Sequence, residues 1–144
     1  MKKLFLMVMI LSFVSSVAMA QNKSYYVPKR GSAERKMIMN AARVPIVKAL
    51  KRRVIFVVDT LRSNGEWAFM TAVPHEPNGS KLKWHKTPYA EDWKGDFMSD
   101  LMVLLLHKEG KHWRAVTHCI GPTDVCWYDW GKKYHVPKAL LMMK

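Results

Sequence analysis

The dipeptide Asn64-Gly65 constrains the fold of this chain more than any other feature, because it separates two strand-like runs. The run before it, 54–58, is β-branched and aromatic, and the run after it, 67–73, is mostly apolar. Asn and Gly tolerate the positive φ angles that tight hairpin turns require. We therefore predict an antiparallel hairpin with strands near 54–62 and 67–74.

A second hairpin is predicted further along the chain. The apolar run 98–107 leads into Lys108-Glu109-Gly110-Lys111, and a second strand-like run follows. We expect strands at 98–108 and 112–120. Apolar residues occupy both faces of the first of these strands, which is typical of a central strand.

Helical periodicity precedes the first hairpin, over residues 32–51. One stripe at helical spacing holds Met37, Ile38, Ala41 and Val44. Pro45 lacks a backbone donor, and the apolar residues after it project mostly to another side of an ideal helix. We therefore expect a kink or break near 43–45.

These elements predict an α+β fold, with an N-terminal kinked helix packed on an antiparallel sheet of about four to five strands. The order of elements is similar to cystatin-like and NTF2-like architectures, a likeness of fold that carries no function with it. The tail from Pro122 is rich in aromatic residues, which we expect to pack back over a sheet edge or the helix.

Residues 1–20 have the three regions of a secretory signal peptide. Lys2 and Lys3 form the charged end, Leu4–Val14 the apolar run, and Ala18-Met19-Ala20 a suitable cleavage site. A transmembrane anchor is the alternative, but the apolar run is shorter than the roughly 20 residues that a span needs. We therefore expect an exported protein, periplasmic or extracellular, with residues 21–144 forming a single domain.

The chain is strongly basic, with 24 Lys and Arg against 11 Asp and Glu and a net charge of +13. Loss of Lys2 and Lys3 with the signal peptide lowers this charge by two. Such a surface favours an anionic partner, for example an anionic envelope polymer, or another protein. The alternative is a surface that serves solubility alone.

Cys119 and Cys126 are the two cysteines of the chain. Export places them where disulfides persist, so we expect them to pair and to staple the end of the last strand. A catalytic thiol at Cys119 served by His118 is the alternative, but strand neighbours point to opposite faces. The sequence predicts no catalytic residue, metal site or cofactor.

A binding site is predicted where cations and aromatic rings occur together. The cations neutralise a polyanion while rings stack on its sugars or bases. The predicted binding residues are Arg52, Arg53, Lys83, Trp84, Lys86, Trp127 and Trp130.

Several short motifs give the chain a family resemblance. They are Arg35-Lys36, Arg43-Val44-Pro45, Phe56-Val57-Val58, Leu61-Arg62, Gly65-Glu66-Trp67-Ala68-Phe69 and Gly121-Pro122-Thr123-Asp124-Val125. Together they resemble a group of small exported bacterial proteins of unknown function. The resemblance implies a bacterial envelope or extracellular location and supplies no catalytic residue. We expect a non-catalytic binding or interaction module; the alternative is a pocket-containing small-ligand-binding protein or an enzyme of an NTF2-like type.

Overall fold

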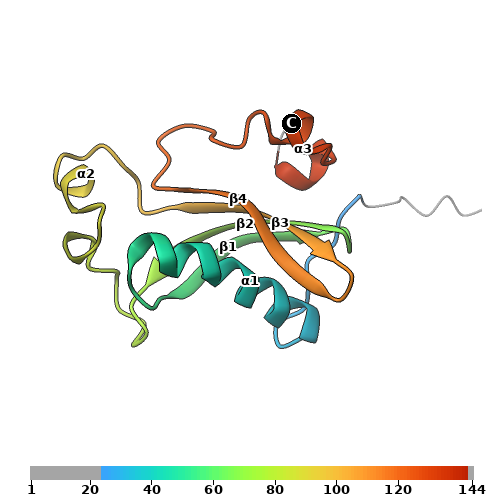
Figure 1. The fold of residues 1–144 in the computed structure, drawn as a ribbon, viewed down its shortest axis with the longest axis horizontal. Helices are drawn as coiled ribbons and strands as arrows, with labels where there is room; N and C mark the ends of the chain where they lie inside the picture. Colours follow the sequence, from blue (N-terminus) through green and yellow to red (C-terminus); the bar gives the residue numbers. More distant parts are fainter. Residues whose placement is uncertain (1–23, 143–144) are drawn as a thin grey trace, which may run out of the picture.

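One long helix and a four-stranded antiparallel sheet make up most of the structure (Figure 1). The computed structural model describes residues 24–142, so the predicted signal peptide at 1–20 lies outside the described residues. No helix within this part of the chain is long and apolar enough to cross a membrane. The elements are α1 (Ala33–Leu50), β1 (Ile55–Ser63), β2 (Trp67–His75), η1 (Trp84–Lys86), α2 (Ala90–Lys94), β3 (Met102–Glu109), β4 (His112–Ile120), α3 (Trp130–Tyr134) and η2 (Lys138–Leu141).

The four strands follow one another in the order β1-β2-β3-β4, each antiparallel to its neighbour. Both predicted hairpins are confirmed. In the first, the Asn64 side-chain oxygen accepts hydrogen bonds from the backbone N–H groups of Glu66 and Trp67, and Gly65 has a φ of +88°. The predicted α+β class is therefore confirmed, with four strands.

The predicted start of the third strand at residue 98 is wrong, because β3 begins at Met102. Before that point the backbone of residues 98–101 bonds to Gly121, whose carbonyl accepts from the Ser99 N–H and whose N–H donates to the Leu101 carbonyl. Gly121 has a φ of +67°, so its chain turns away there and leaves residues 98–101 without a continuing partner strand.

Helix α1 runs without a break through Pro45, so a break near 43–45 is ruled out and the predicted kink there is not confirmed. The fully buried stripe consists of residues four positions apart, namely Ile38, Ala42, Ile46 and Leu50. This stripe continues on both sides of Pro45, and its packing on the sheet holds the helix together despite the missing backbone donor. Of the predicted stripe, Ile38 is fully buried as expected, whereas Met37 is 38% and Val44 69% exposed.

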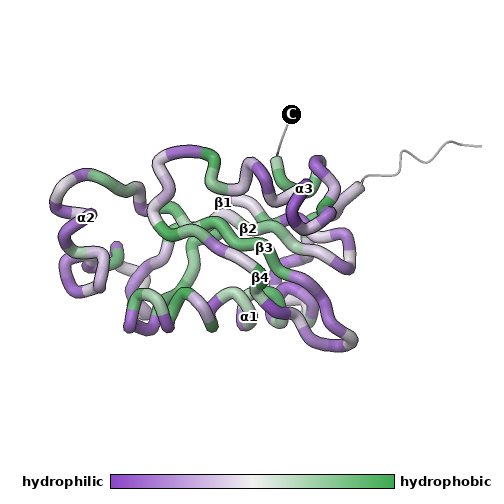
Figure 2. Tube along the Cα trace, turned by 45° about the horizontal axis from the view of Figure 1, so that its top comes forward, coloured by the Kyte–Doolittle hydropathy of each residue, from purple (hydrophilic) through white to green (hydrophobic). Residues whose placement is uncertain are grey.

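Apolar layers cover both faces of the sheet. Met102, Leu104 and Leu106 of β3 belong to the cluster under α1, while Val103 and Leu105 belong to a cluster with the C-terminal segment. Figure 1 shows α1 on one side of the sheet and α3 on the other, and Figure 2 shows the apolar strands between polar outer segments. The aromatic tail thus packs on the face opposite α1, and not on the helix as one expectation had it.

The connection between β2 and β3 carries η1 and α2 at one end of the molecule (Figure 1). Between β2 and η1 the chain makes one isolated antiparallel bridge, between His75 and Lys81.

A candidate anion-binding site

Arg52, one of the predicted binding residues, forms an ion pair with Glu76, which was not among the predicted site residues. Its Nη2 lies 3.0 Å and 2.8 Å from the two carboxylate oxygens of Glu76. The same carboxylate accepts a hydrogen bond of 3.0 Å from the backbone N–H of Lys83. Arg52 therefore ties the end of α1 to the loop after β2, and its charge is matched by Glu76.

These contacts also shift the acidity of Glu76. The hydrogen bond from the Lys83 N–H is the largest influence, the Arg52 hydrogen bond comes next, and together they hold the pKa of Glu76 below its usual range. Glu76 is thus ionised at neutral pH, which favours the pairing of Arg52.

The three predicted binding tryptophans do not form one surface. Trp84 is 3% exposed and lies in the cluster under α1, while Trp130 is 5% exposed and lies in the cluster on the other sheet face. Trp127 is half-buried beside Trp130, with its ring 5.8 Å from that of Phe69. The expectation that Trp84 and Trp130 are free to bind is wrong, because small sheets need large rings to cover them.

Of the remaining predicted residues, Arg53, Lys83 and Lys86 have exposed side chains. Arg53 follows α1 and lines a hollow there, and Lys86 closes the turn η1. The structure therefore brings Arg52 and the Lys83 backbone together through Glu76, and leaves Arg53 as the predicted cation that borders a concave surface.

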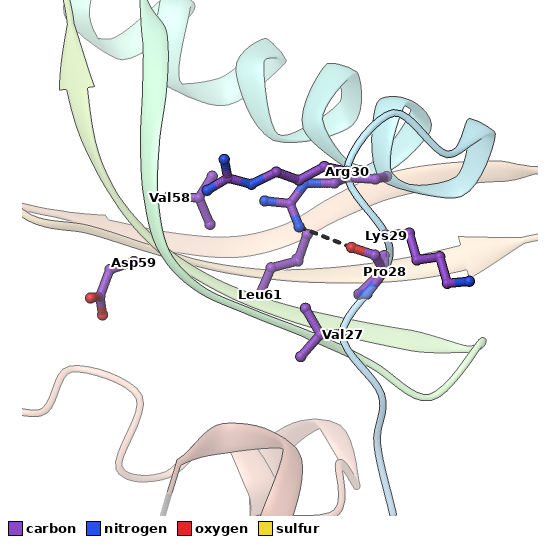
Figure 3. A pocket seen from close by; sticks show the side chains of 8 residues that line it. Val27, Pro28, Lys29, Arg30, Val58, Asp59 and Leu61 are labelled. Atoms are coloured by element: carbon purple, nitrogen blue, oxygen red, sulfur yellow. Dashed lines mark hydrogen bonds between the residues drawn. The ribbon is translucent and has the colours of Figure 1, made fainter.

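Cations line two hollows between α1 and the edge strand β1, and Arg53 borders one of them. A first hollow of about 270 Å³ lies near the start of α1 and has Lys29, Arg30 and Arg35 on its wall, with Val58 and Leu61 as apolar lining. The Arg35 guanidinium donates a hydrogen bond of 2.9 Å to the Pro28 carbonyl, which fixes its direction (Figure 3). The Arg30 side chain extends alongside it toward β1.

A second hollow, of about 330 Å³, lies near the end of α1 and contains Arg43 and Arg53 with Val47, Val54 and Ile55. The Arg43 guanidinium sits over the Phe56 ring, 5.6 Å from its centroid. Arg35 and Arg43 are eight residues apart on one helix, which places them roughly 12 Å apart along its axis. The two hollows therefore follow the same side of α1. We call Lys29, Arg30, Arg35, Arg43 and Arg53 the α1–β1 cations.

The acids near these cations are turned away or engaged elsewhere. Among the described residues, Asp59 is the one acid that lines either hollow, and its carboxylate accepts from the Thr60 and Thr71 hydroxyls. Figure 3 shows Asp59 pointing away from Arg30. Within α1, Glu34 accepts hydrogen bonds from Tyr26 and Ser63, so its carboxylate is also engaged.

Tyr26 is one of the two residues whose hydroxyl groups donate hydrogen bonds to the Glu34 carboxylate. Burial, followed by the hydrogen bond to Glu34, raises the pKa of the Tyr26 hydroxyl, which therefore remains a neutral donor. Tyr26 also pairs through its backbone with Ser63 at the end of β1. The segment that carries Lys29 and Arg30 is thereby anchored on the sheet edge.

Other chemistry-bearing groups of the described residues are used structurally. Cys119 and Cys126 form the predicted disulfide, with their Cα atoms 6.7 Å apart, so neither is a thiol. Within residues 24–142 no three His, Cys, Asp or Glu side chains gather as a metal site would require. Of the α1–β1 cations the sequence analysis predicted Arg53 and missed the other four, because the five residues come from three separate segments of the chain.

Comparisons with protein-family models, with characterised protein sequences and with solved structures found no match to this chain.

Proposed function

We propose that this protein is an exported, non-catalytic module that binds an anionic polymer through the α1–β1 cations. One observation carries the proposal: five cations line two hollows along one side of α1, and the nearby carboxylates are turned away or engaged elsewhere. An excess of positive charge beside a concave surface attracts polyanions and gains from the release of their counterions.

The identity of the cations supports an anion that bears phosphate, sulfate or carboxylate groups. Four of the five are arginines, whose planar guanidinium groups match such oxyanions with two parallel hydrogen bonds. The Pro28 carbonyl orients Arg35, and the Phe56 ring supports Arg43. Guanidinium groups that are held in place lose less side-chain entropy on binding, which favours affinity.

A surface site also fits the packing better than the alternative of an NTF2-like pocket between helix and sheet. In an enzyme or small-ligand protein of that kind, the space under the helix is hollow. Here Ile38, Ala42, Ile46 and Leu50 fill that space and are all fully buried. The geometry therefore favours recognition along the side of α1, although the order of one helix and a strand meander remains similar to a cystatin-like architecture.

The proposed location of the protein is outside the cytoplasm, after export. The charged and apolar regions of residues 1–20, the disulfide and the resemblance to small exported bacterial proteins are consistent with a periplasmic or extracellular protein. Anionic polymers are abundant in bacterial envelopes, and a basic domain placed there meets them at high local concentration. The partner we propose is such an envelope polymer.

The test compares two triple variants that remove equal charge. Arg30→Gln/Arg43→Gln/Arg53→Gln changes the α1–β1 cations, and Lys111→Gln/Lys132→Gln/Lys138→Gln changes exposed cations elsewhere. Residues 21–144 of each protein are bound to immobilised heparin and to immobilised polyphosphate over about 50 to 200 mM salt, an interval in which such contacts weaken markedly.

We expect the arginine triple variant to elute at clearly lower salt from at least one of these matrices. Its plot of log affinity against log salt should also be shallower by about 2 to 3, because each lost phosphate contact reduces the slope by about 0.7 to 0.9. The lysine triple variant should retain most of the affinity. Equal losses in both variants would show a diffuse charge effect and overturn the site, as would the absence of retention at low salt.

A further inference from the structure

Trp93 forms an exposed aromatic platform at the end of the molecule where α2 lies. Its ring is stacked on that of Trp84, with centroids 5.4 Å apart and planes 18° from parallel. Trp84 is 3% exposed and meets the Tyr89 ring edge-on at 6.3 Å, so the inner ring is fixed. Trp93 itself is 41% exposed. One face of Trp93 is thus held rigidly and much of the ring remains open to solvent.

Trp93 borders a hollow of about 480 Å³, which it shares with Lys94, Asp96, Met98, Ser99 and Asp100. This volume falls within the roughly 300 to 1,000 Å³ of small-molecule sites. The Ser99 hydroxyl already has hydrogen-bond partners within the protein, since it donates to the Pro122 carbonyl and accepts from the Leu101 N–H. Within the described residues the carboxylates of Asp96 and Asp100 have neither a hydrogen bond nor an ion pair, so they are available to a ligand.

The polar groups of this hollow differ from those of the α1–β1 cations. Two carboxylates accept hydrogen bonds and the Lys94 ammonium donates them, while Glu91 and Asp92 add exposed acids on α2. An anionic ligand is disfavoured by this acidic surrounding. A simple cation would use the carboxylates but would be repelled by Lys94.

A ligand whose groups both donate and accept would use every part of the hollow. Sugar hydroxyls can donate to the two carboxylates and accept from Lys94, and the C–H face of a sugar ring can stack on a flat indole. We propose that the Trp93 hollow binds a neutral sugar unit, with Trp93 as the platform and Asp96, Asp100 and Lys94 as the polar contacts. This site is separate from the α1–β1 cations, so the result of its test does not bear on the proposal that those cations bind an anionic polymer.

The experiment measures binding of cellotetraose, tetra-N-acetylchitotetraose and maltotetraose to residues 21–144 by isothermal titration calorimetry and by shifts of the tryptophan indole N–H signals in NMR. At least one of these sugars is expected to bind and to move the Trp93 indole signal. Affinity should change less than twofold between 50 and 200 mM salt, because a neutral ligand releases no counterions; the test thereby separates this site from charge-driven polymer binding.

Trp93→Ala should weaken this binding at least tenfold, in line with the loss of a stacked ring in other complexes. Asp96→Asn/Asp100→Asn leaves the aromatic stack intact and should also weaken it several-fold; Asn suits Asp96 because that residue has a φ of +59°. Tyr128→Ala, which removes a 74% exposed ring from another segment, is the matched control and should bind normally.

Three results would overturn the proposal. The first is that none of the three sugars binds, and the second is that binding survives both Trp93→Ala and Asp96→Asn/Asp100→Asn. The third is that tetramethylammonium chloride moves the Trp93 indole signal while the sugars do not, which would assign the hollow to an organic cation.

Discussion

At the scale of single residues, Glu76 shows how an acid in a basic chain is used for structure. Its side chain is 10% exposed, and that of Arg52 is 26% exposed. The carboxylate accepts hydrogen bonds from the Arg52 guanidinium and the Lys83 N–H, and these lower its pKa. An acid whose pKa is lower in the folded state stabilises the fold above its unfolded pKa, and this stabilisation is lost as pH falls through the folded pKa.

Glu76→Gln should therefore lower the free energy of unfolding at pH 7 by about 1.5 to 3 kcal/mol, the range for hydrogen bonds to charged groups. The difference between wild type and variant should shrink as pH falls below the ordinary value of 4.5, because Glu76 of the unfolded chain then takes up a proton while folded Glu76, with its lower pKa, is still ionised; it should be lost once pH has also fallen through the folded pKa. Urea unfolding at pH 7, 5, 4 and 3 measures this. Glu109→Gln, which disrupts an exposed pair with Arg114, is the control and should have a much smaller effect. A loss for Glu76→Gln that stays constant over this pH range would contradict the assignment.

The sequence could not predict which of the tryptophans are buried and which are exposed. Trp84 and Trp93 lie in the same irregular connection between β2 and β3, where no periodicity separates buried from exposed positions. Lysines on both sides of Trp84 suggested exposure, yet that ring is in the core and Trp93 is open. Burial here follows from long-range packing under α1, which local composition does not encode.

At the scale of elements, hairpins were predictable because their signals are local. Asn64-Gly65 and the turn at 109–111 mark both reversals, and the strand bounds agree to within a residue or so except at the start of β3. The buried stripe of α1 was not predictable, because apolar residues occur on several sides of this helix. Two stripes offset by one residue, one through Met37 and one through Ile38, have similar composition, and only contact with the sheet selects between them.

The disulfide joins β4 to the segment that covers the far sheet face, and its removal should loosen that segment. Cys119 and Cys126 are seven residues apart and pack in the cluster with Phe69 and Trp130. Closure of so short a loop stabilises by about 2 to 3 kcal/mol in the chain-entropy model. We expect Cys119→Ser/Cys126→Ser to lose about this much in urea unfolding, and reduced wild type to behave like the variant. Two free thiols titrated in unreduced, denatured protein would show that the bond does not form.

At the scale of the whole molecule, the net charge could be obtained from the sequence, but the positions at which the cations gather on the surface could not. The net charge of +13 can be counted from the sequence, and Arg53, one of the predicted binding residues, lies just after the end of α1. The other α1–β1 cations gather only because the lead-in segment, the helix and the edge strand meet in space. Sequestration of Glu34, Asp59 and Glu76 then determines which cations stay free, and each of these contacts joins residues distant in the chain or on different elements.

At the same scale, the C-terminal segment covers one whole face of the sheet, and we expect the fold to depend on this cover. Phe69, Val103 and Leu105 are fully buried on the sheet face opposite α1, under a cover of Trp130, Val136, Leu140 and Leu141. Burial of each large apolar side chain contributes about 1.5 to 3 kcal/mol. The four covering residues therefore contribute an amount comparable with the about 5 to 15 kcal/mol by which domains are stable.

We accordingly expect residues 21–120, carrying Cys119→Ser, to lack a cooperative unfolding transition, to bind the dye ANS and to aggregate. The matched control is the chain 21–144 with Cys119→Ser/Cys126→Ser, which lacks the disulfide but keeps the cover, and it should unfold cooperatively. Thermal unfolding followed by near-ultraviolet circular dichroism measures both proteins. A sharp transition in the shortened chain would mean that α1 and the sheet fold without the second layer. The covering segment would then be an attachment to a complete domain, and its aromatic residues would have to be explained by some role other than stability.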